Sequence, residues 1–241
     1  MPIRKVWHDA PMSEMTILYR DEHYIAVDKP AGLLVHRTRI SEDSRFLLQQ
    51  LRDQIGRRVY PVHRLDRPTS GVLIFGLDSD AARRLVQLFE QRQVQKRYLA
   101  VVRGYTAESD VIDYPLREEA HKAPQAAVTG YRRLATVELP IAVGRYASAR
   151  YSLLEVRPET GRMHQIRKHM KHIFHPIVGD TTHGDGRHNQ LFRDRFGICR
   201  LLLMAAELNF VHPYSGVALS IGTRPDTELA GLFERLGFGS E

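Results

Sequence analysis

The spacing of short apolar segments between turn residues is the feature that most limits how this chain of 241 residues can fold. Most of these segments have the length and composition of strands, whereas only a few carry the three- and four-residue spacing of an amphipathic helix. The strands cluster without the strict strand–helix–strand alternation of a parallel sheet. We therefore predict an α+β fold, with a mixed, largely antiparallel central sheet flanked by helices.

The expected elements are bounded by turn residues, by Gly and Pro, or by plausible helix caps such as Ser41. The segments expected to form strands are 16–29 (around a turn at 20–23), 71–77, 96–104, 126–139, 149–158, 198–211 and 217–222. The expected helices are 41–56, 79–94, 160–176 and 226–238. Residues 104–127 show no clear period, and residues 179–197 are polar and predicted to be a loop.

Length and an apolar content of 43% predict a single domain over residues 15–241, preceded by a flexible extension over residues 1–14. No apolar run approaches the roughly 18 residues needed to span a bilayer, and the N-terminus lacks the apolar core of a signal peptide. The single cysteine, Cys199, permits neither an intramolecular disulfide nor a thiolate zinc site. We expect a cytoplasmic monomer without membrane contacts.

The charge balance favours an anionic partner. The chain has 35 Lys and Arg against 28 Asp and Glu, a formal net charge of +7 and a pI near 9.7. Such an excess of positive charge is typical of nucleic-acid-binding proteins. A basic enzyme with no nucleic-acid partner would show the same balance, so this alternative stays open.

One carboxylate stands among bases in the segment "HRLDRPTSG". Asp66 is flanked by His63, Arg64 and Arg67. Cationic neighbours favour the charged form of a carboxyl group, which suits a nucleophile or a base better than a general acid. If this carboxylate is buried, it needs a dedicated cation. The simpler alternative is that Asp and Ser only cap a turn here.

A second cluster, "TGRMHQIRKHMKH", can supply that cation. Helical spacing places Ile166 and Met170 on one face, with Arg167 and Lys171 beside it and His164 on their side. A basic stripe at the border of a core can reach a buried acid or a phosphate. A solvated face of an amphipathic helix would look the same.

A tyrosine in a strand-like segment and a group of histidines are two further candidates for functional residues. Tyr98 lies in the strand-like "KRYLAVVRG", where a single Tyr is usually a core residue. Four histidines at 164, 169, 172 and 175 invite a metal site, which we discount because no carboxylate or Cys joins them at ligand spacing. Glycine-rich phosphate-binding loops are absent. We therefore expect no metal and no cofactor.

"HRLDRPTSGVLIF", "KRYLAVVRG" and "TGRMHQIRKHM", in that order, resemble the signature blocks of the RluA-type pseudouridine synthases. "VDKPAGLLVH" resembles the opening motif of that family, and "HPIVGDTTHGD" and "LLLMAAELNFVHP" resemble its closing blocks. The similarity runs from Met15 to about Ile221. Within the family, "DYPLREE" and "GDGRHN" are most similar to the enzymes that modify uridine 65 in certain tRNAs.

The resemblance implies a role for each matched residue. Asp66 is the expected nucleophile, Arg167 its ion-pair partner, and Tyr98 the residue that lies against the target base. Arg64 is expected to fill the space that the flipped-out nucleotide leaves. The residues expected to contact RNA are His63, Arg64, Arg67, Arg162, His164 and Lys171.

The implied reaction converts uridine to pseudouridine: the N1–C1′ bond breaks, the base turns, and C5 bonds to C1′. Atoms are neither gained nor lost, so the reaction requires no cofactor. Asp66 could attack C1′ or C6, or remove a sugar proton. The alternatives for the whole protein are an rRNA enzyme of the same family, a non-catalytic RNA chaperone, or a hydrolase that uses the histidines to bind a metal.

Overall fold

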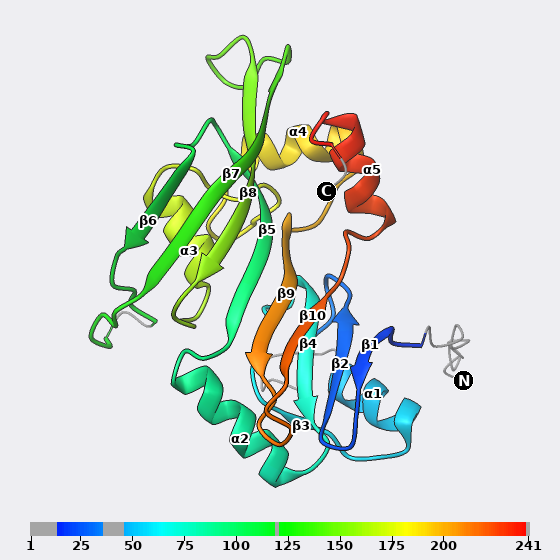
Figure 1. The fold of residues 1–241 in the computed structure, drawn as a ribbon. Coiled ribbons are helices and arrows are strands. Elements are labelled where there is room, and N and C mark those ends of the chain that lie inside the picture. The colour runs from blue at the N-terminus through cyan, green and yellow to red at the C-terminus, as the bar shows by residue number, and fades with distance from the viewer. Residues whose placement is uncertain (1–13, 36–45, 119–120, 240–241) are drawn as a thin grey trace, which may run out of the picture.

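The computed structural model describes residues 14–35, 46–118 and 121–239, and these form a ten-stranded sheet with five helices (Figure 1). The strands are β1 (Ile17–Arg20), β2 (Tyr24–Lys29), β3 (Tyr60–Pro61), β4 (Ser70–Gly76), β5 (Gln95–Arg103), β6 (Ser109–Asp113), β7 (Val128–Leu139), β8 (Ala149–Pro158), β9 (Leu203–Val211) and β10 (Ala218–Gly222). The helices are α1 (Leu47–Ile55), α2 (Ser79–Glu90), α3 (Gln165–His172), α4 (Gly186–Phe196) and α5 (Thr227–Arg235).

The sheet has the order β1-β2-β4-β9-β5-β8-β7-β6, with β10 beside β9 and β3 beside β4. Among the described strands, β4 and β9 run parallel and every other pair is antiparallel. The predicted α+β class with a mixed, largely antiparallel sheet is therefore confirmed.

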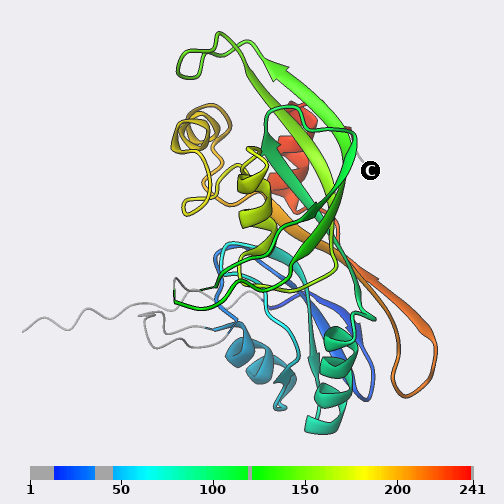
Figure 2. The same cartoon turned by 90° about the vertical axis from the view of Figure 1, so that its left-hand side faces the viewer.

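Helices α1 and α2 cover opposite faces of the lower part of the sheet (Figure 2). Alternate residues of a strand point to opposite faces: Val27 of β2 packs in one cluster with Leu47 of α1, and Ala26 packs in another with Leu85 of α2. Both faces of β4 are therefore covered. For this reason the segment "VLIFGL" (residues 72–77), which runs from β4 into the next residue, is apolar at almost every position.

The strands of the upper part use the same alternation to contact the other three helices. Val102 of β5 lies in a cluster with Met170 of α3, whereas Val101 lies in a cluster with Phe192 of α4 and Leu232 of α5. The apolar stretch of β5 therefore has no solvent-exposed face. This packing holds α3 against the sheet, where it contacts β7 and β8.

The prediction that residues 104–127 have no regular element was wrong in part, because β6 lies within them. This strand pairs with β7 along one side only, at the end of the sheet. Of its five residues, Ile112 is buried and the others are exposed. An edge strand with one buried residue gives almost no apolar periodicity to recognise.

The predicted loop at residues 179–197 was also wrong in part, because α4 occupies its second half. Asp185 caps the helix and Gly197, in the left-handed conformation, ends it. The buried apolar residues Leu191 and Phe192 are adjacent in sequence. Two adjacent apolar residues in a polar segment do not show the spacing by which helices are recognised.

The other expected elements are present, with shifted ends. The helix predicted at 41–56 is described from Leu47 onward, and the cap proposed at Ser41 lies outside the described residues, as does nearly all of the extension predicted at 1–14. The helix predicted at 160–176 runs only from Gln165 to His172. In the described part of the chain, no helix is long and apolar enough to cross a membrane.

The parallel junction between β4 and β9 depends on a glycine. Gly71 lies opposite Ala205 and has a φ of +109°, a conformation that side chains disfavour. A Cβ atom at this position would lie 2.1 Å from the carbonyl oxygen of Ala205. The two backbones can approach this closely only because position 71 has no side chain.

We expect Gly71→Ala to lower the free energy of unfolding by at least about 2 kcal/mol, from backbone strain and steric overlap together. Gly231→Ala is the matched control, since Gly231 lies inside α5 with no atom within 4 Å of its would-be Cβ. That change should be neutral or stabilise by about 0.5–1 kcal/mol. Thermal and urea unfolding of both variants measure the difference, and equal stabilities would contradict this account of the junction.

Candidate active site

Asp66 lies in the loop between β3 and β4, where a turn directs its side chain away from the strand. The backbone N–H of Thr69 donates to the carbonyl oxygen of Asp66 over 3.1 Å, which closes a four-residue turn. The side chain of Asp66 is 20% exposed. The carboxylate is therefore largely enclosed but still open to a substrate.

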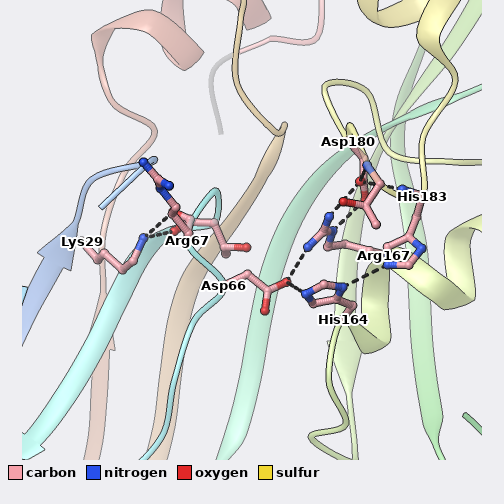
Figure 3. Close-up of polar contacts among 9 residues, drawn as sticks. Lys29, Asp66, Arg67, His164, Arg167, Asp180 and His183 are labelled. Carbon is pink, nitrogen blue, oxygen red and sulfur yellow. Dashed lines mark hydrogen bonds and ion pairs between the residues drawn. The ribbon is translucent and has the colours of Figure 1, made fainter. Parts of the chain in front are cut away.

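Lys29, at the end of β2, holds this turn from the left-hand side in Figure 3, away from Arg167. Its side chain is fully buried, and Nζ donates to the carbonyl oxygens of Pro30 (3.0 Å), Arg67 (2.9 Å) and Thr69 (2.7 Å). Burial lowers the pKa of Lys29 to about 7, and the charge of Asp66 acts in the opposite direction. Three acceptors match the three donors of an ammonium group, so we assign the charged form to Lys29.

Arg167, on α3, reaches Asp66 from the opposite side (Figure 3). Its Nη1 donates to Oδ2 of Asp66 over 3.0 Å, and its side chain is only 5% exposed. The contact that the sequence resemblance implied is therefore present, between residues 101 positions apart. Oδ1 of Asp66 accepts no hydrogen bond from the part of the chain that the structure describes.

Asp180 anchors Arg167 and was not found by sequence reasoning. Its carboxylate accepts hydrogen bonds from Nε of Arg167 at 2.7 Å and from Nη2 at 2.8 Å. It also accepts the backbone N–H groups of Thr182 and His183 at 2.9 Å each. Burial would raise the pKa of Asp180, but these donors outweigh it and lower the pKa. The only sequence signal was its place in the closing block "HPIVGDTTHGD", to which no role had been assigned.

The backbone around Asp180 is fixed by Asn189 of α4. Asn189 donates its side-chain N–H to the carbonyl oxygen of Asp180 at 2.9 Å and accepts the N–H of Gly179 at 2.7 Å. Helix α4, which was not predicted, therefore fixes the backbone that holds Asp180 against Arg167.

His164 is the third side chain beside Asp66. It precedes α3 with a φ of +56°, and its Nε2 lies 3.8 Å from Oδ2 of Asp66. Its Nδ1 is hydrogen-bonded to Nε2 of His183 at 3.0 Å. Burial lowers the pKa of His164, although the charge of Asp66 opposes this. Both histidines are therefore assigned as neutral near pH 7.

Tyr98 on β5 lies between Val156 of β8 and Ala205 of β9. It is partly buried and packs against the clusters of both halves of the sheet. Burial, with a smaller contribution from the charge of Asp66, raises the pKa of Tyr98 above its ordinary value. The hydroxyl therefore stays protonated at neutral pH and is a poor base.

A family model described as RNA pseudouridylate synthase matches residues 23–172, a range that holds Asp66, Tyr98 and Arg167. The chain belongs to this family. The RluA-type resemblance seen in the sequence is thereby confirmed.

Similar proteins cover nearly the whole chain of this synthase. The tRNA pseudouridine synthase C of Vibrio cholerae is 51% identical over 235 residues, which are 93% of this chain and 96% of that protein. The protein of the same name from Yersinia pestis is 51% identical over 235 residues, 93% of this chain and 91% of that one. Among solved structures, human RNA Pseudouridylate Synthase Domain Containing 1 gives a TM-score of 0.71 at 25% identity, covering 97% of this chain and 99% of that chain.

The structure distributes the residues expected to contact RNA over different environments. Arg64 is exposed two positions before Asp66, and Lys171 is exposed in the last turn of α3. Arg162 donates from Nε to the carbonyl oxygen of Ala126 at 3.2 Å. These exposed or partly exposed side chains lie on the segments that carry Asp66 and Arg167.

Arg67 and His63 have structural contacts that the sequence did not reveal. Nε of Arg67 donates to the carbonyl oxygen of Gly32 at 3.0 Å and ties the loop after β2 to the turn of Asp66. His63 stacks on Phe89 with centroids 4.7 Å apart, and its Nε2 accepts the N–H of Ile74 at 3.2 Å. Burial lowers the pKa of His63 to about 3, so its ring is neutral and joins β4 to α2.

The four histidines of segment 164–175 do not converge on one point. Their partners are His183 for His164, Thr129 and the backbone of Tyr114 for His169, the Tyr114 ring for His172, and the backbone of Arg103 for His175. Within the described residues, no group of three or more His, Cys, Asp or Glu side chains could hold a metal ion.

We expect Asp180→Asn to destabilise the protein by about 3–5 kcal/mol, because Arg167 would keep only one of its two carboxylate partners in a buried site. Asp194→Asn is the matched control: Asp194 is exposed on α4, where Gln190 donates to it. Its change should alter stability by no more than about 0.5 kcal/mol. Thermal unfolding of the two variants measures the difference, and a wild-type melting temperature for Asp180→Asn would contradict the anchoring role.

Proposed function

We propose that this protein isomerises a specific uridine to pseudouridine in tRNA, at position 65, with Asp66 as the nucleophile. The observation that carries the proposal is the enclosed carboxylate of Asp66, which is held by Arg167 at Oδ2 and accepts no hydrogen bond at Oδ1 from the described residues. Its membership of the RNA pseudouridylate synthase family fixes the reaction class. The choice of tRNA is supported by relatives named tRNA pseudouridine synthase C.

The geometry suits a reaction that needs one oriented carboxylate in a site with little water. Arg167 and the Lys29-supported turn hold Asp66 from two sides before the substrate arrives. Such preorganisation avoids reorientation of the charge during the reaction. Asp66 attacks the nucleoside, and the uracil base then turns within the site before C5 bonds to C1′.

The target base must leave its stack in the RNA before Asp66 can reach it, at a cost of a few kcal/mol. Arg64 is exposed on the segment that carries Asp66. Its planar guanidinium can stack in the gap and contact phosphate, which offsets part of that cost. Arg162 and Lys171 extend the positive surface along α3 and the loop before it, and the neutral His164 lies between them in sequence.

Tyr98 supports the uracil ring in this proposal. Its position between β8 and β9 and its contacts with two core clusters hold the ring in place. The raised pKa of Tyr98 argues against proton abstraction by its hydroxyl. The packing role is therefore favoured over the role of a base.

The alternative of a non-catalytic RNA chaperone is disfavoured by the energetics of the site. A protein that only binds RNA gains nothing from a buried arginine between two carboxylates, because burial of such charges is costly. Exposed Lys and Arg side chains would bind phosphates without that cost. An rRNA synthase of the same family remains the second candidate, since it would use the same site.

We further propose that the protein is cytoplasmic and monomeric and that residues 15–241 form one domain. The domain is supported by the sheet, which continues from β1 to β6 without interruption. Light scattering coupled to size-exclusion chromatography tests the monomer.

We expect Asp66→Asn to abolish turnover and leave tRNA binding within a few-fold of wild type, because the amide keeps the shape of the carboxylate but not its nucleophilicity. Tritium release from tRNA carrying C5-labelled uridine measures turnover, and a filter-binding assay measures affinity. The control is Asp194→Asn, which should behave as wild type in both assays. Release by the Asp66→Asn variant at the wild-type rate would rule out the nucleophile assignment.

We expect Arg167→Lys to lower the single-turnover rate constant much more than Arg193→Lys, a matched change at an exposed position of α4. Lysine keeps the charge but cannot bridge two carboxylates with one planar fork. Measurements at saturating tRNA exclude a simple loss of affinity. Equal rate constants for the two variants would mean that another residue orients Asp66.

Pseudouridine mapping in total RNA from cells with and without the gene decides between the two RNA classes. We expect one site to disappear, at position 65 of certain tRNAs. Expression of the wild-type chain should restore that site, and expression of Asp66→Asn should not. Loss of an rRNA site with tRNA unchanged would favour the second candidate.

A further inference from the structure

His164 and His183 form a hydrogen-bonded pair next to Asp66, and the only role proposed so far for either is RNA contact by His164. His164 takes a left-handed backbone conformation, with a φ of +56° and a ψ of +28°. This conformation is uncommon for residues other than glycine and asparagine and marks a position that the surroundings fix. Here it directs the ring toward Asp66 and His183 (Figure 3).

The two rings form a chain that begins at the carboxylate of Asp66. Nε2 of His164 lies 3.8 Å from Oδ2 of Asp66, and Nδ1 of His164 is bonded to Nε2 of His183 at 3.0 Å. The backbone N–H of His183 donates to Oδ1 of Asp180 at 2.9 Å. The chain is therefore held by the same aspartate that anchors Arg167.

A hydrogen bond between two neutral imidazoles contains one proton. When His164 donates from Nδ1, its Nε2 carries a lone pair on the side of Asp66. Burial lowers the pKa of each ring. The charge of Asp180 opposes this shift at both rings and that of Asp66 opposes it at His164, whereas the charges of Arg167 and Lys168 add to it. Both rings are thus neutral and able to accept a proton near pH 7.

The proposed reaction requires a base late in its course. Once C5 is bonded to C1′, the C5–H bond must break to restore the aromatic ring. Tyr98 is protonated. Asp66 is the nucleophile in this proposal, and as a carboxylate held by Arg167 it is a weaker base than an imidazole. With Nδ1 as the donor to His183, the imidazole of His164 is, of the groups described next to Asp66, the neutral one whose acceptor atom faces that carboxylate.

We propose that His164 accepts the proton released from C5 and that His183 passes it on to solvent. The electron pair of the C5–H bond forms the C5=C6 double bond, and the C6=N1 pair moves onto N1. N1 then takes a proton from water, so that protons and electrons balance without a co-reactant. His164 moves its Nδ1 proton to Nε2 of His183, which releases a proton from Nδ1 to water.

This inference rests on the proposed isomerase function and adds a catalytic residue, His164, and a relay residue, His183. The test uses His164→Gly, because glycine accepts a positive φ without strain and leaves space for a free imidazole molecule. At saturating tRNA we expect its rate constant for pseudouridine formation to fall at least about 100-fold, the usual contribution of a general base. Added imidazole should restore a large part of that rate.

Deuterium at C5 of the target uridine provides a second readout. If proton removal becomes rate-limiting without His164, a primary isotope effect should be larger in His164→Gly than in wild type. His183→Asn should slow the reaction less but change the isotope effect in the same direction. His172→Gln, on the exposed part of the same helix, is the control and should leave the rate and the isotope effect unchanged.

The outcomes separate the inference from its competitors. A wild-type rate for His164→Gly at saturating tRNA, with weaker binding, would assign His164 to RNA contact and overturn the proposal. A slow variant that neither imidazole nor deuterium affects would assign it a structural role and also overturn it. If the wild-type protein forms no pseudouridine in any tRNA, the proposed function itself fails, and the histidine variants then decide nothing in its favour.

Discussion

One buried arginine between two carboxylates determines how this site is built. Arg167 uses Nε and Nη2 for Asp180 and Nη1 for Asp66, so a single planar group binds both the anchor and the proposed nucleophile. Lys29 holds the other side of the Asp66 turn through the carbonyl oxygens of Arg67 and Thr69. Asp66 is therefore the member of this set that keeps one carboxylate oxygen without a hydrogen bond from the described residues, whereas Arg167 and Lys29 have partners for their donors. Such a carboxylate can meet a substrate without rearrangement of the groups around it.

The site lies where the two parts of the sheet meet. Asp66 comes from the loop that leads into β4, whereas Arg167 and His164 come from α3, which packs on the upper part (Figure 1). The parallel contact between β4 and β9 joins these parts, and it is close because Gly71 has no side chain. Small changes at this junction would move the acid relative to its cation. The stability of the fold and the geometry of the site thus depend on the same few residues.

The protonation states of Tyr98 and of the two histidines decide which of these groups could act as a base. Tyr98 keeps its proton because burial disfavours the phenolate, so it can only pack against a ring or donate a hydrogen bond. The histidines are neutral for the same reason, since burial disfavours the imidazolium, but a neutral imidazole retains an acceptor. Burial therefore suppresses one possible base and preserves another. This difference follows from the charge of the protonated group, which is zero for a phenol and positive for an imidazolium.

The sequence by itself determined the fold class and most of the strands, because local spacing records these directly, and its motif blocks singled out Asp66, Tyr98 and Arg167 as candidate site residues through a family resemblance. It also indicated RNA as the partner through the excess of positive charge. Only the tertiary structure decided what supports the acid: Asp180 and Lys29 lie far from Asp66 in sequence, and they act through Arg167 and through the backbone of the Asp66 turn. The elements that were missed, α4 and β6, have few buried residues and therefore no clear pattern. Long-range pairing of charges leaves no signal in local spacing, since its energy arises only when folding brings the partners together.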